Sequence, residues 1–319
     1  MRFILRRLAL TVVTLFLVSA FSFLAFSVIR GDPASLILGT EATPEQLAAL
    51  REEMGLNQNP VERYFRWLGN FFSGNLGSSV RFRGESISAM IASRLPVTIT
   101  LAALSLFFMA LVAVPVSLCS VRREGGIVDR IVNTFTAIGI SVPGFFWGVL
   151  FIWIFGVSLR LFSPGIYVDY RQNFVRFIGC LFFPALAIAI PNAAILVKFL
   201  RSSLFRELGG DYVRTARSKG ASPAAALRRH ALRNALVPAI TVLGMIAAET
   251  FSGSIIIEQV FTIPGMGRLL IAAISSRDYP LIQTLVVYIA FIVVFANMSA
   301  DIAIQVIDPR IRLEKDSWK

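Results

Sequence analysis

Long apolar stretches alternate with polar segments along the chain. Six of these stretches are long enough to cross a hydrocarbon core about 30 Å thick, which takes roughly 20 helical residues. They cover about residues 8–29, 97–119, 133–158, 177–199, 236–257 and 284–307. The pattern therefore predicts an all-α integral membrane protein with six transmembrane helices.

Composition supports a membrane location. Hydrophobic residues make up 56% of the chain and charged residues 16%, which is too apolar for a soluble fold of this length. The first apolar stretch follows MRFILRR and resembles a signal peptide, but no small-residue cleavage site follows it. We expect this stretch to be retained as an anchor.

The distribution of Lys and Arg predicts the orientation. With the N-terminus inside, the cytoplasmic segments hold 19 of these residues and the two short external loops hold five. Because short cytoplasmic loops carry the excess of positive charge, both termini are predicted to be cytoplasmic. The net charge of +12 then marks the side that faces anionic lipid, and it requires no nucleic-acid partner.

The predicted spans divide the chain into three parts. Residues 1–29 form the N-terminus and the first span, and residues 30–96 form an external, periplasmic helical module. Residues 97–319 form a core of five spans, with a cytoplasmic loop at about 200–235 and an external re-entrant loop at about 259–283.

The external module is expected to contain two helices. Thr43, Pro44 and Gln46 predict the start of the first, which should end at Gly55. The second should run from Pro60 to about residue 73 and carries many aromatic residues. These aromatics either pack against the membrane or the module, or form a docking surface for an external partner.

The last external segment, residues 258–280, has the character of an interfacial or re-entrant element. A turn is expected before a short apolar helix over residues 268–276, which is too short to cross the membrane. It either lines the outer mouth of a pathway or packs as a lid for stability. The candidate gate residues are Pro264, Gly265, Gly267, Arg268 and Asp278.

Two acidic residues lie inside predicted spans. A charge in the middle of a span costs about 2.5–3.5 kcal/mol on insertion scales, so such a side chain usually faces a protein interior or an aqueous cavity. Glu249, with Ser252 and Gly253, is a candidate for a translocation pathway, although a structural hydrogen-bonding role for Glu249 stays open. A structural role is expected for Asp301. Gly244 and Ser254 either allow close helix packing or leave space along a pore.

The largest cytoplasmic loop contains a cationic segment, residues 212–238, without any acidic residue. Gly220 and Pro223 divide it into helical pieces at about 212–219 and 224–236, which predicts a bent helical hook. Attraction to anionic lipid would explain the charges. It does not explain the small residues, which are needed where another backbone must come close.

This segment carries a family resemblance. RTARSKG resembles the cytoplasmic EAA loop of ABC-importer permeases, and YVRTARSKGAS followed by RHALRNALVPAITVLG resembles their dipeptide, oligopeptide and nickel branch. Two departures stand out: Arg214 replaces the usual Glu, and the family's Ile-x-Leu-Pro ending is His230 to Arg233 here, with a proline only at Pro238.

Further motifs that resemble the same branch follow along nearly the whole chain in the expected order. They are RGDPA (30–34), MGLNQNPVERYFRWL (54–68), GNLGSS (74–79), RLPVTITLA (94–102), EQVFTIPGMGRLL (258–270), RDYPLIQ (277–283) and DPRIRL (308–313).

The resemblance implies a type I importer permease in the inner membrane of a bacterium or archaeon. In such permeases the hook inserts into a groove on a cytoplasmic ATP-binding subunit. The implied partners are a second homologous permease chain in a heterodimer, two ATP-binding subunits and an external solute-binding protein. The solute would be a short peptide, nickel or a metal chelate. The implied coupling residues are Arg214, Thr215, Ala216, Lys219, Gly220, Ala221 and Ser222.

The chain itself shows no sign of enzymatic chemistry. It lacks a G-x-x-x-x-G-K-[ST] loop, so we expect no cofactor on this chain and assign ATP and Mg²⁺ to partner subunits. One histidine and two separated cysteines offer no soft-ligand metal cage, and no H-E-x-x-H motif supports an intramembrane hydrolase. An ATP-independent channel or secondary transporter is the main alternative, but it would leave the hook without a purpose.

Overall fold

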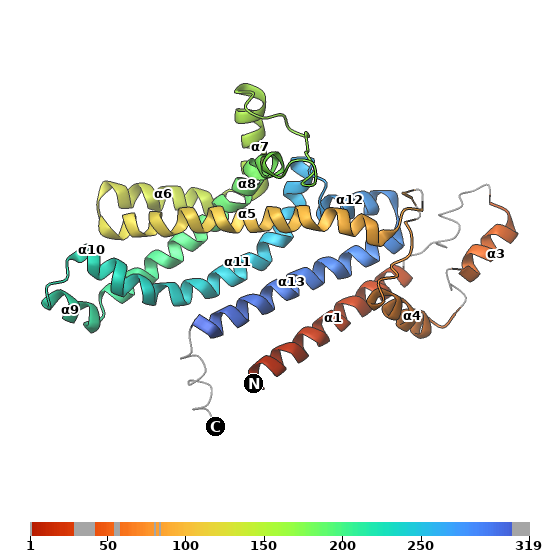
Figure 1. Cartoon of the computed structure of the whole chain (residues 1–319), viewed down its shortest axis with the longest axis horizontal. Coiled ribbons are helices and arrows are strands. Elements are labelled where there is room, and N and C mark those ends of the chain that lie inside the picture. Colours follow the sequence, from red (N-terminus) through yellow and green to blue (C-terminus); the bar gives the residue numbers. More distant parts are fainter. Residues whose placement is uncertain (1, 29–41, 54–57, 80, 83, 308–319) are drawn as a thin grey trace. The chain divides into compact units, whose positions relative to one another are not determined.

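The computed structural model describes residues 2–28, 42–53, 58–79, 81–82 and 84–307. Within these ranges the chain forms helices and connecting turns, apart from one isolated bridge between Ser78 and Ser86 (Figure 1). The expected helix end at Gly55 and the motifs at 30–34 and 308–313 lie outside the described residues. The predicted all-α architecture is confirmed for the described part of the chain.

Among the residues that the structure describes, five helices are long and apolar enough to cross a membrane. Several extend beyond the predicted apolar stretches, because their polar ends continue the same helix. The five are α1 (Arg2–Val28), α5 (Ile87–Arg122), α8 (Phe174–Leu208), α11 (Leu232–Val260) and α13 (Tyr279–Ile307).

The predicted third span, residues 133–158, is not one helix. It is divided between α6 (Ile127–Ser141) and α7 (Gly144–Phe151), which a π-helical segment, η1 (Ile152–Ser158), continues. The two arms meet at a bend of 100°. Val142 is extended, as a residue before proline prefers, and Pro143 has no N–H to continue a helix. The stretch predicted as the third span is thus a bent pair of helices, and the described residues contain six candidate spans if that pair counts as one.

The chain divides into two compact units, and the first comprises residues 1–97 and 264–294. It holds α1, α3 (Pro44–Glu53), α4 (Pro60–Phe72), α12 (Met266–Ser276) and the first parts of α5 and α13. Its core forms where α12 packs with those two first parts. The core residues are Ile87, Met90, Ile91, Met266, Leu269, Ala273, Leu281, Ile282 and Leu285.

Both external helices begin where the sequence predicts. The Thr43 N–H donates to Gln46 Oε1 at 3.1 Å, and the Gln46 N–H donates to Thr43 Oγ1 at 3.3 Å, which is the reciprocal capping box. At the start of α4 the Val61 N–H donates to Asn59 Oδ1 at 3.0 Å. These bonds satisfy backbone donors that a helix start leaves without intrahelical partners.

Aromatic residues of α4 pack inside the first unit. Tyr64 is buried, and its hydroxyl lies 2.8 Å from Ser19 Oγ of α1. The ring of Phe71 lies 5.3 Å from that of Tyr288 in α13, whereas Phe72 stays exposed. In these contacts the aromatic surface holds α4 against α1 and α13, as the packing interpretation of the sequence expects.

The second unit comprises residues 98–263 and the part of α13 from Phe295. Its central helix is α8, which contacts α6, α7 and α11 (Figure 1). A core cluster of this unit lies around the C-terminal half of α8, and small residues allow the helices to approach closely there. It includes Met109, Ala113, Val121, Ala193, Val197, Leu200, Leu204, Ala235 and Ala239.

Candidate functional site

The cationic loop forms the hook that the sequence predicts. Its first helix, α9 (Asp211–Ser218), ends at Ser218, and Gly220 follows two residues later with a φ of +91°. The Gly220 N–H donates to Arg217 O at 3.0 Å and the Ala221 N–H donates to Ala216 O at 3.1 Å. This pair of bonds is the Schellman motif, which needs a left-handed residue after the helix. A Cβ on Gly220 would meet nothing within 4 Å, so backbone conformation, not crowding within the chain, selects glycine.

The second arm of the hook leads directly into a membrane span. Ser222 caps α10 (Pro223–Ala226) by accepting from the Ala225 N–H at 3.3 Å, with Pro223 at the first helical position. A π-helical segment, η2 (Leu227–Ala231), then joins α10 to α11. The hook, defined here as residues 211–231, is therefore continuous with the helix that carries Glu249.

The hook has a buried side and an exposed side. Val213, Leu227 and further apolar residues join the core cluster around Leu200 and Leu204 of α8. The opposite side presents most of the predicted coupling residues to the surroundings. Arg214, Thr215, Lys219, Gly220 and Ser222 are exposed, and Ala216 and Ala221 are partly buried. The arrangement gives a rigidly anchored element with a basic, small-residue surface, and the coupling role of these seven residues stays a prediction.

A tyrosine fixes the start of α9 to the end of α8. The Tyr212 hydroxyl donates to Glu207 Oε2 at 2.5 Å. Burial raises the pKa of the Tyr212 phenol above its usual range, and the hydrogen bond to the Glu207 carboxylate acts in the same direction. Tyr212 therefore stays neutral and keeps its donor at physiological pH.

The predicted pathway residues share one face of α11. Glu249, Ser252 and Gly253 are all exposed in this chain, and Met245 and Ile256 extend the same face by one turn in each direction. Residues three and four positions apart lie above one another on a helix, so the five positions form a continuous stripe. The stripe places a carboxyl group on an otherwise apolar span surface.

The small residues of α11 serve different purposes. A Cβ on Gly244 would lie 2.5 Å from the Ala300 Cβ, so Gly244 permits close packing of α11 against α13 within the second unit. Ser254 is buried and its hydroxyl donates to Phe251 O at 2.8 Å. A Cβ on Gly253, in contrast, would meet nothing within 4 Å. Asp301 lies in α13, and its side chain is outside the described part of the chain.

The segment 264–278 packs into the core of the first unit. Gly265, Gly267 and most of the apolar face of α12 are buried, whereas Pro264 and Arg268 are partly buried. Asp278 is buried at the start of α13, where its Oδ1 accepts from the Leu281 N–H at 3.4 Å.

Asp278 also binds the external module. Its Oδ2 accepts from the Ser79 hydroxyl and, at 3.2 Å, from the Arg81 N–H. Asp278 therefore caps α13 and binds Ser79 and Arg81 at the same time. These contacts fit the packing interpretation of the segment, and the gating role of Pro264, Gly265, Gly267, Arg268 and Asp278 stays a prediction.

Sequence reasoning missed two buried carboxylates. Glu258 of α11 is fully buried and accepts from Thr98 Oγ1 at 2.6 Å. Asp129 of α6 accepts from Ser120 Oγ at 2.5 Å and lies 3.0 Å from Arg201 Nη2. An acidic residue amid the basic residues of a cytoplasmic loop was a usable signal for Asp129. No local signal identified its partner in α8.

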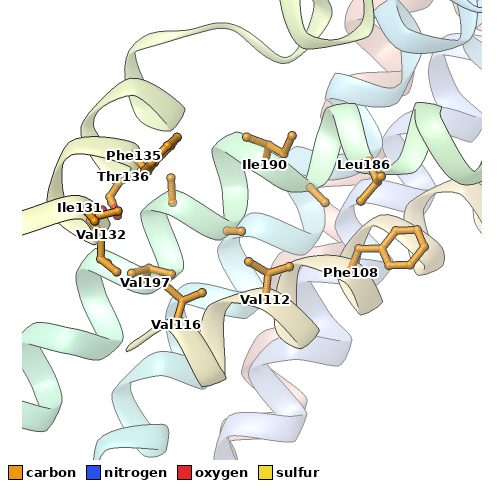
Figure 2. Close-up of a pocket in the computed structure, with 13 residues that line it drawn as sticks. Phe108, Val112, Val116, Ile131, Val132, Phe135, Thr136, Leu186, Ile190 and Val197 are labelled. Carbon is orange, nitrogen blue, oxygen red and sulfur yellow. The ribbon is translucent and has the colours of Figure 1, made fainter. Parts of the chain in front are cut away.

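An apolar hollow of about 310 Å³ lies between α5, α6 and α8 (Figure 2). Its walls are almost entirely hydrocarbon. The hydroxyl of Thr136 donates to Val132 O, which leaves that polar group satisfied. Labelled residues around it are Phe108, Val112, Val116, Ile131, Val132, Phe135, Thr136, Leu186, Ile190 and Val197.

These features define a multi-span helical membrane protein with an anchored hook and a polar stripe on one span. Residues 110–313 match the family described as binding-protein-dependent transport system inner membrane component, and residues 1–102 match its N-terminal family. The chain belongs to this family. It is an inner-membrane permease component of an ABC transporter, not the ATPase, and its system includes a binding protein and an ATPase.

Relatives align with nearly the full length of this chain and of their own chains. A probable peptide ABC transporter permease protein, y4tP of Sinorhizobium fredii, is 39% identical over 97% of this chain and 99% of its own. The dipeptide transport system permease protein DppB of Lactococcus lactis is 34% identical over 98% and 99%. The oligopeptide transport system permease protein AppB of Bacillus subtilis is 33% identical over 97% and 98%.

Proposed function

We propose that this chain forms half of the translocation pathway of an ATP-driven importer of short peptides. Relatives that align over nearly the whole chain are named as peptide, dipeptide and oligopeptide permeases. A second homologous permease chain would supply the other half, two ATP-binding subunits would bind the hooks, and an external binding protein would deliver the peptide. Nickel or a metal chelate is the alternative solute.

The hook is the observation that carries the coupling role. Its buried side is fixed to α8, so a force on its exposed side is transmitted to the membrane helices. Its exposed small residues allow another backbone to approach closely, and Gly220 ends α9 in a fixed geometry. Closure of two ATP-binding subunits would thus move the helices as rigid bodies between inward-facing and outward-facing states.

The stripe on α11 supports the pathway role. Exposure of Glu249 to lipid would cost about 2.5–3.5 kcal/mol on insertion scales. Apposition of this face to the same face of a second permease chain removes the carboxyl group from lipid and lines an aqueous route between the two chains. Ser252 and Gly253 lie one turn along that face and add little bulk to it.

The energy source is assigned to partner subunits. Because the chain lacks a phosphate-binding G-x-x-x-x-G-K-[ST] loop, ATP and Mg²⁺ would be bound by the cytoplasmic subunits. The chain would contribute only the mechanical connection and the route for the solute.

Gentle detergent extraction followed by mass spectrometry tests this assignment. We expect the chain to retain a second six-span chain and two ATP-binding subunits. In liposomes, the purified complex with its binding protein should take up a radiolabelled tripeptide only when ATP and Mg²⁺ are present, and excess Ni²⁺ should not compete.

Other outcomes of this experiment would reject parts of the proposal. A chain that stays alone and conducts solute without ATP would establish the channel or secondary-transporter alternative. An assembled complex that takes up ⁶³Ni²⁺ and ignores the tripeptide would keep the importer and replace its solute.

A further inference from the structure

A partly buried ionic cluster joins three helices of the second unit. Asp129 Oδ2 accepts from Arg201 Nη2 at 3.1 Å and from the Gly125 N–H at 3.2 Å, while Oδ1 accepts from the Ser120 hydroxyl at 2.5 Å. Asp129 is 5% exposed. The Arg201 guanidinium also lies over the Phe205 ring, 4.9 Å from its centroid. We call Ser120, Gly125, Asp129 and Arg201 the clamp.

The clamp connects the hook to helices that the hook does not follow in sequence. Ser120 lies in the last turn of α5, Gly125 in the turn after it, and Asp129 in the first turn of α6. Arg201 lies about two turns before α8 ends and passes into the hook. The α5–α6 turn and the hook lie at the same end of the second unit (Figure 1).

Next to the clamp, the apolar hollow lies between the same three helices. Val116, Val132 and Val197 line it, and each lies one helical turn from a member of the clamp (Figure 2). The hollow is open at the surface of the unit, since Val112, Ile131 and Phe135 on its walls are exposed. The three helices are thus joined at a polar point, and the hollow next to it leaves about 310 Å³ into which side chains can close.

We propose that Asp129 and Arg201 are positioning residues that transmit movement of the hook to α5 and α6. The inference rests on the proposed function, because it assumes that an ATP-binding subunit moves the hook. When α8 moves with the hook, the clamp carries the α5–α6 turn with it, and the hollow gives the helices room to rotate about that point.

The chemistry of the clamp favours this role over simple stabilisation. A buried ion pair is a poor source of stability compared with apolar packing of the same volume, but it fixes the relative position of its partners. Arg201 Nη2 lies within 3.1 Å of both carboxylate oxygens, and its hydrogen bond to Oδ2 is charge-assisted, which makes the connection a strong one. Arg201 Nε is buried and has no hydrogen-bond partner among the described residues, which leaves a donor for a different partner in another state.

The test is the amount of peptide taken up per ATP hydrolysed by the complete complex in liposomes. Asp129→Asn should leave ATP hydrolysis within about twofold of the wild type. Uptake of a radiolabelled tripeptide per ATP should fall by about 5- to 150-fold, the range that corresponds to typical coupling between sites. Glu124→Gln is the matched control, because Glu124 is an exposed acid in the same turn.

Arg201→Lys and Ser120→Ala extend the test. Lysine keeps the charge but loses the planar guanidinium that lies over the Phe205 ring, so its ratio should lie between those of the wild type and Asp129→Asn. Ser120→Ala removes one donor and keeps the ion pair, so it should assemble and lower the ratio by a smaller factor.

The results separate failure of the clamp from failure of the proposed function. A wild-type complex without ATP-dependent tripeptide uptake overturns both. A transporting wild type with an Asp129→Asn variant of unchanged ratio overturns the clamp alone. If the Asp129→Asn complex fails to assemble, Ser120→Ala and Arg201→Lys complexes that take up as much tripeptide per ATP as the wild type overturn the clamp proposal.

A distance measurement gives a second readout that a purely structural role would not change. With Cys119 and Cys180 replaced by Ser, spin labels at Glu124 and Ser218 report the separation of the α5–α6 turn and the hook. The clamp predicts the same separation in nucleotide-free and ATP-bound complexes, and a nucleotide-dependent separation after Asp129→Asn. Identical behaviour of both backgrounds rejects the proposal.

Discussion

Gly220 in the hook has two possible reasons to be glycine: its left-handed backbone conformation, and the close approach of a partner subunit. Substitutions of different size at this position separate the two. The φ of +91° costs an ordinary L-residue about 1–2 kcal/mol from backbone sterics alone. Because an added Cβ meets nothing within 4 Å, this cost is similar for Ala and Arg in the isolated chain. The penalty corresponds to about a 5- to 30-fold loss of the native hook conformation.

Close approach of a partner would add a second loss of binding affinity, which grows with the size of the side chain at position 220. If the hook enters a groove on an ATP-binding subunit, Gly220→Ala should weaken binding of that subunit by about 5- to 30-fold. Gly220→Arg should weaken it further and uncouple ATP hydrolysis from uptake while the chain stays inserted and folded. Gly220→Asn should have the smallest backbone cost, since Asn tolerates the left-handed region.

The assay is titration of the purified ATP-binding subunit onto permease complexes in nanodiscs, together with tripeptide uptake. Gly165→Arg is the matched control, because Gly165 also has a positive φ of +86° and open space around its Cβ but lies in the loop before α8. Equal binding by Gly220→Ala and Gly220→Arg would refute the close approach. Normal solute-driven transport by Gly220→Arg would refute the assignment of the hook itself.

Three further substitutions test other parts of the chain. Glu249→Gln should change the rate of tripeptide uptake and leave the complex assembled; loss of the complex on a native gel would instead assign Glu249 a structural role. Asp278→Ala removes the cap of α13 and the bond from Ser79, so we expect about 1–3 kcal/mol less stability and a lower melting temperature of the purified complex, with a smaller shift for Ser79→Ala. An equal shift for both would rule out the cap. The raised pKa of Tyr212 means that its contribution to hook stability is present below pH of about 10, the unfolded value, and is lost as pH rises through the higher folded value. Limited digestion of the hook by subtilisin, an alkaline protease, should therefore accelerate above that pH in the wild type, whereas Tyr212→Phe should show a smaller change; a fall in protection between pH 6 and 8 would contradict the argument.

Local chemistry made much of this fold predictable. The capping pair Thr43 and Gln46 marks a helix start within four residues of sequence, and Gly220 followed by Pro223 marks the bend of the hook. Each signal works because the backbone bonds that it satisfies belong to the same turn. The position of Glu249 on an exposed face could also be proposed from one helix alone.

The sharpness of the bend at Pro143 could not be predicted from the apolar stretch 133–158 alone. A proline inside a span often bends a helix, since neighbouring groups satisfy the backbone. Gly144 packs so closely on α8 that an added Cβ would lie 3.3 Å from Ala187 O. This contact between segments that are distant in sequence accompanies the bend of 100° between α6 and α7.

Long-range pairs were beyond sequence reasoning. Arg201 and Asp129 are 72 positions apart, and Thr98 and Glu258 are 160 apart. Nothing in either local pattern specifies which of the many basic or hydroxyl residues supplies the partner. Only packing of the spans against one another brings these groups together.

The π-helical segment η2 makes the connection between the hook and the stripe tolerant of the loss of one residue. An α-helix turns by about 100° per residue, because it has 3.6 residues per turn. A π-helical turn holds one residue more than an α-helical turn, so loss of one residue from Leu227–Ala231 would let the segment become an ordinary helix while α11 keeps its orientation relative to the hook. The same loss from the α-helical part of α11 before Glu249 would rotate Glu249 off its face. Natural variation in chain length should therefore be tolerated in η2 and in loops such as the one that holds Gly165, and should avoid α11 itself.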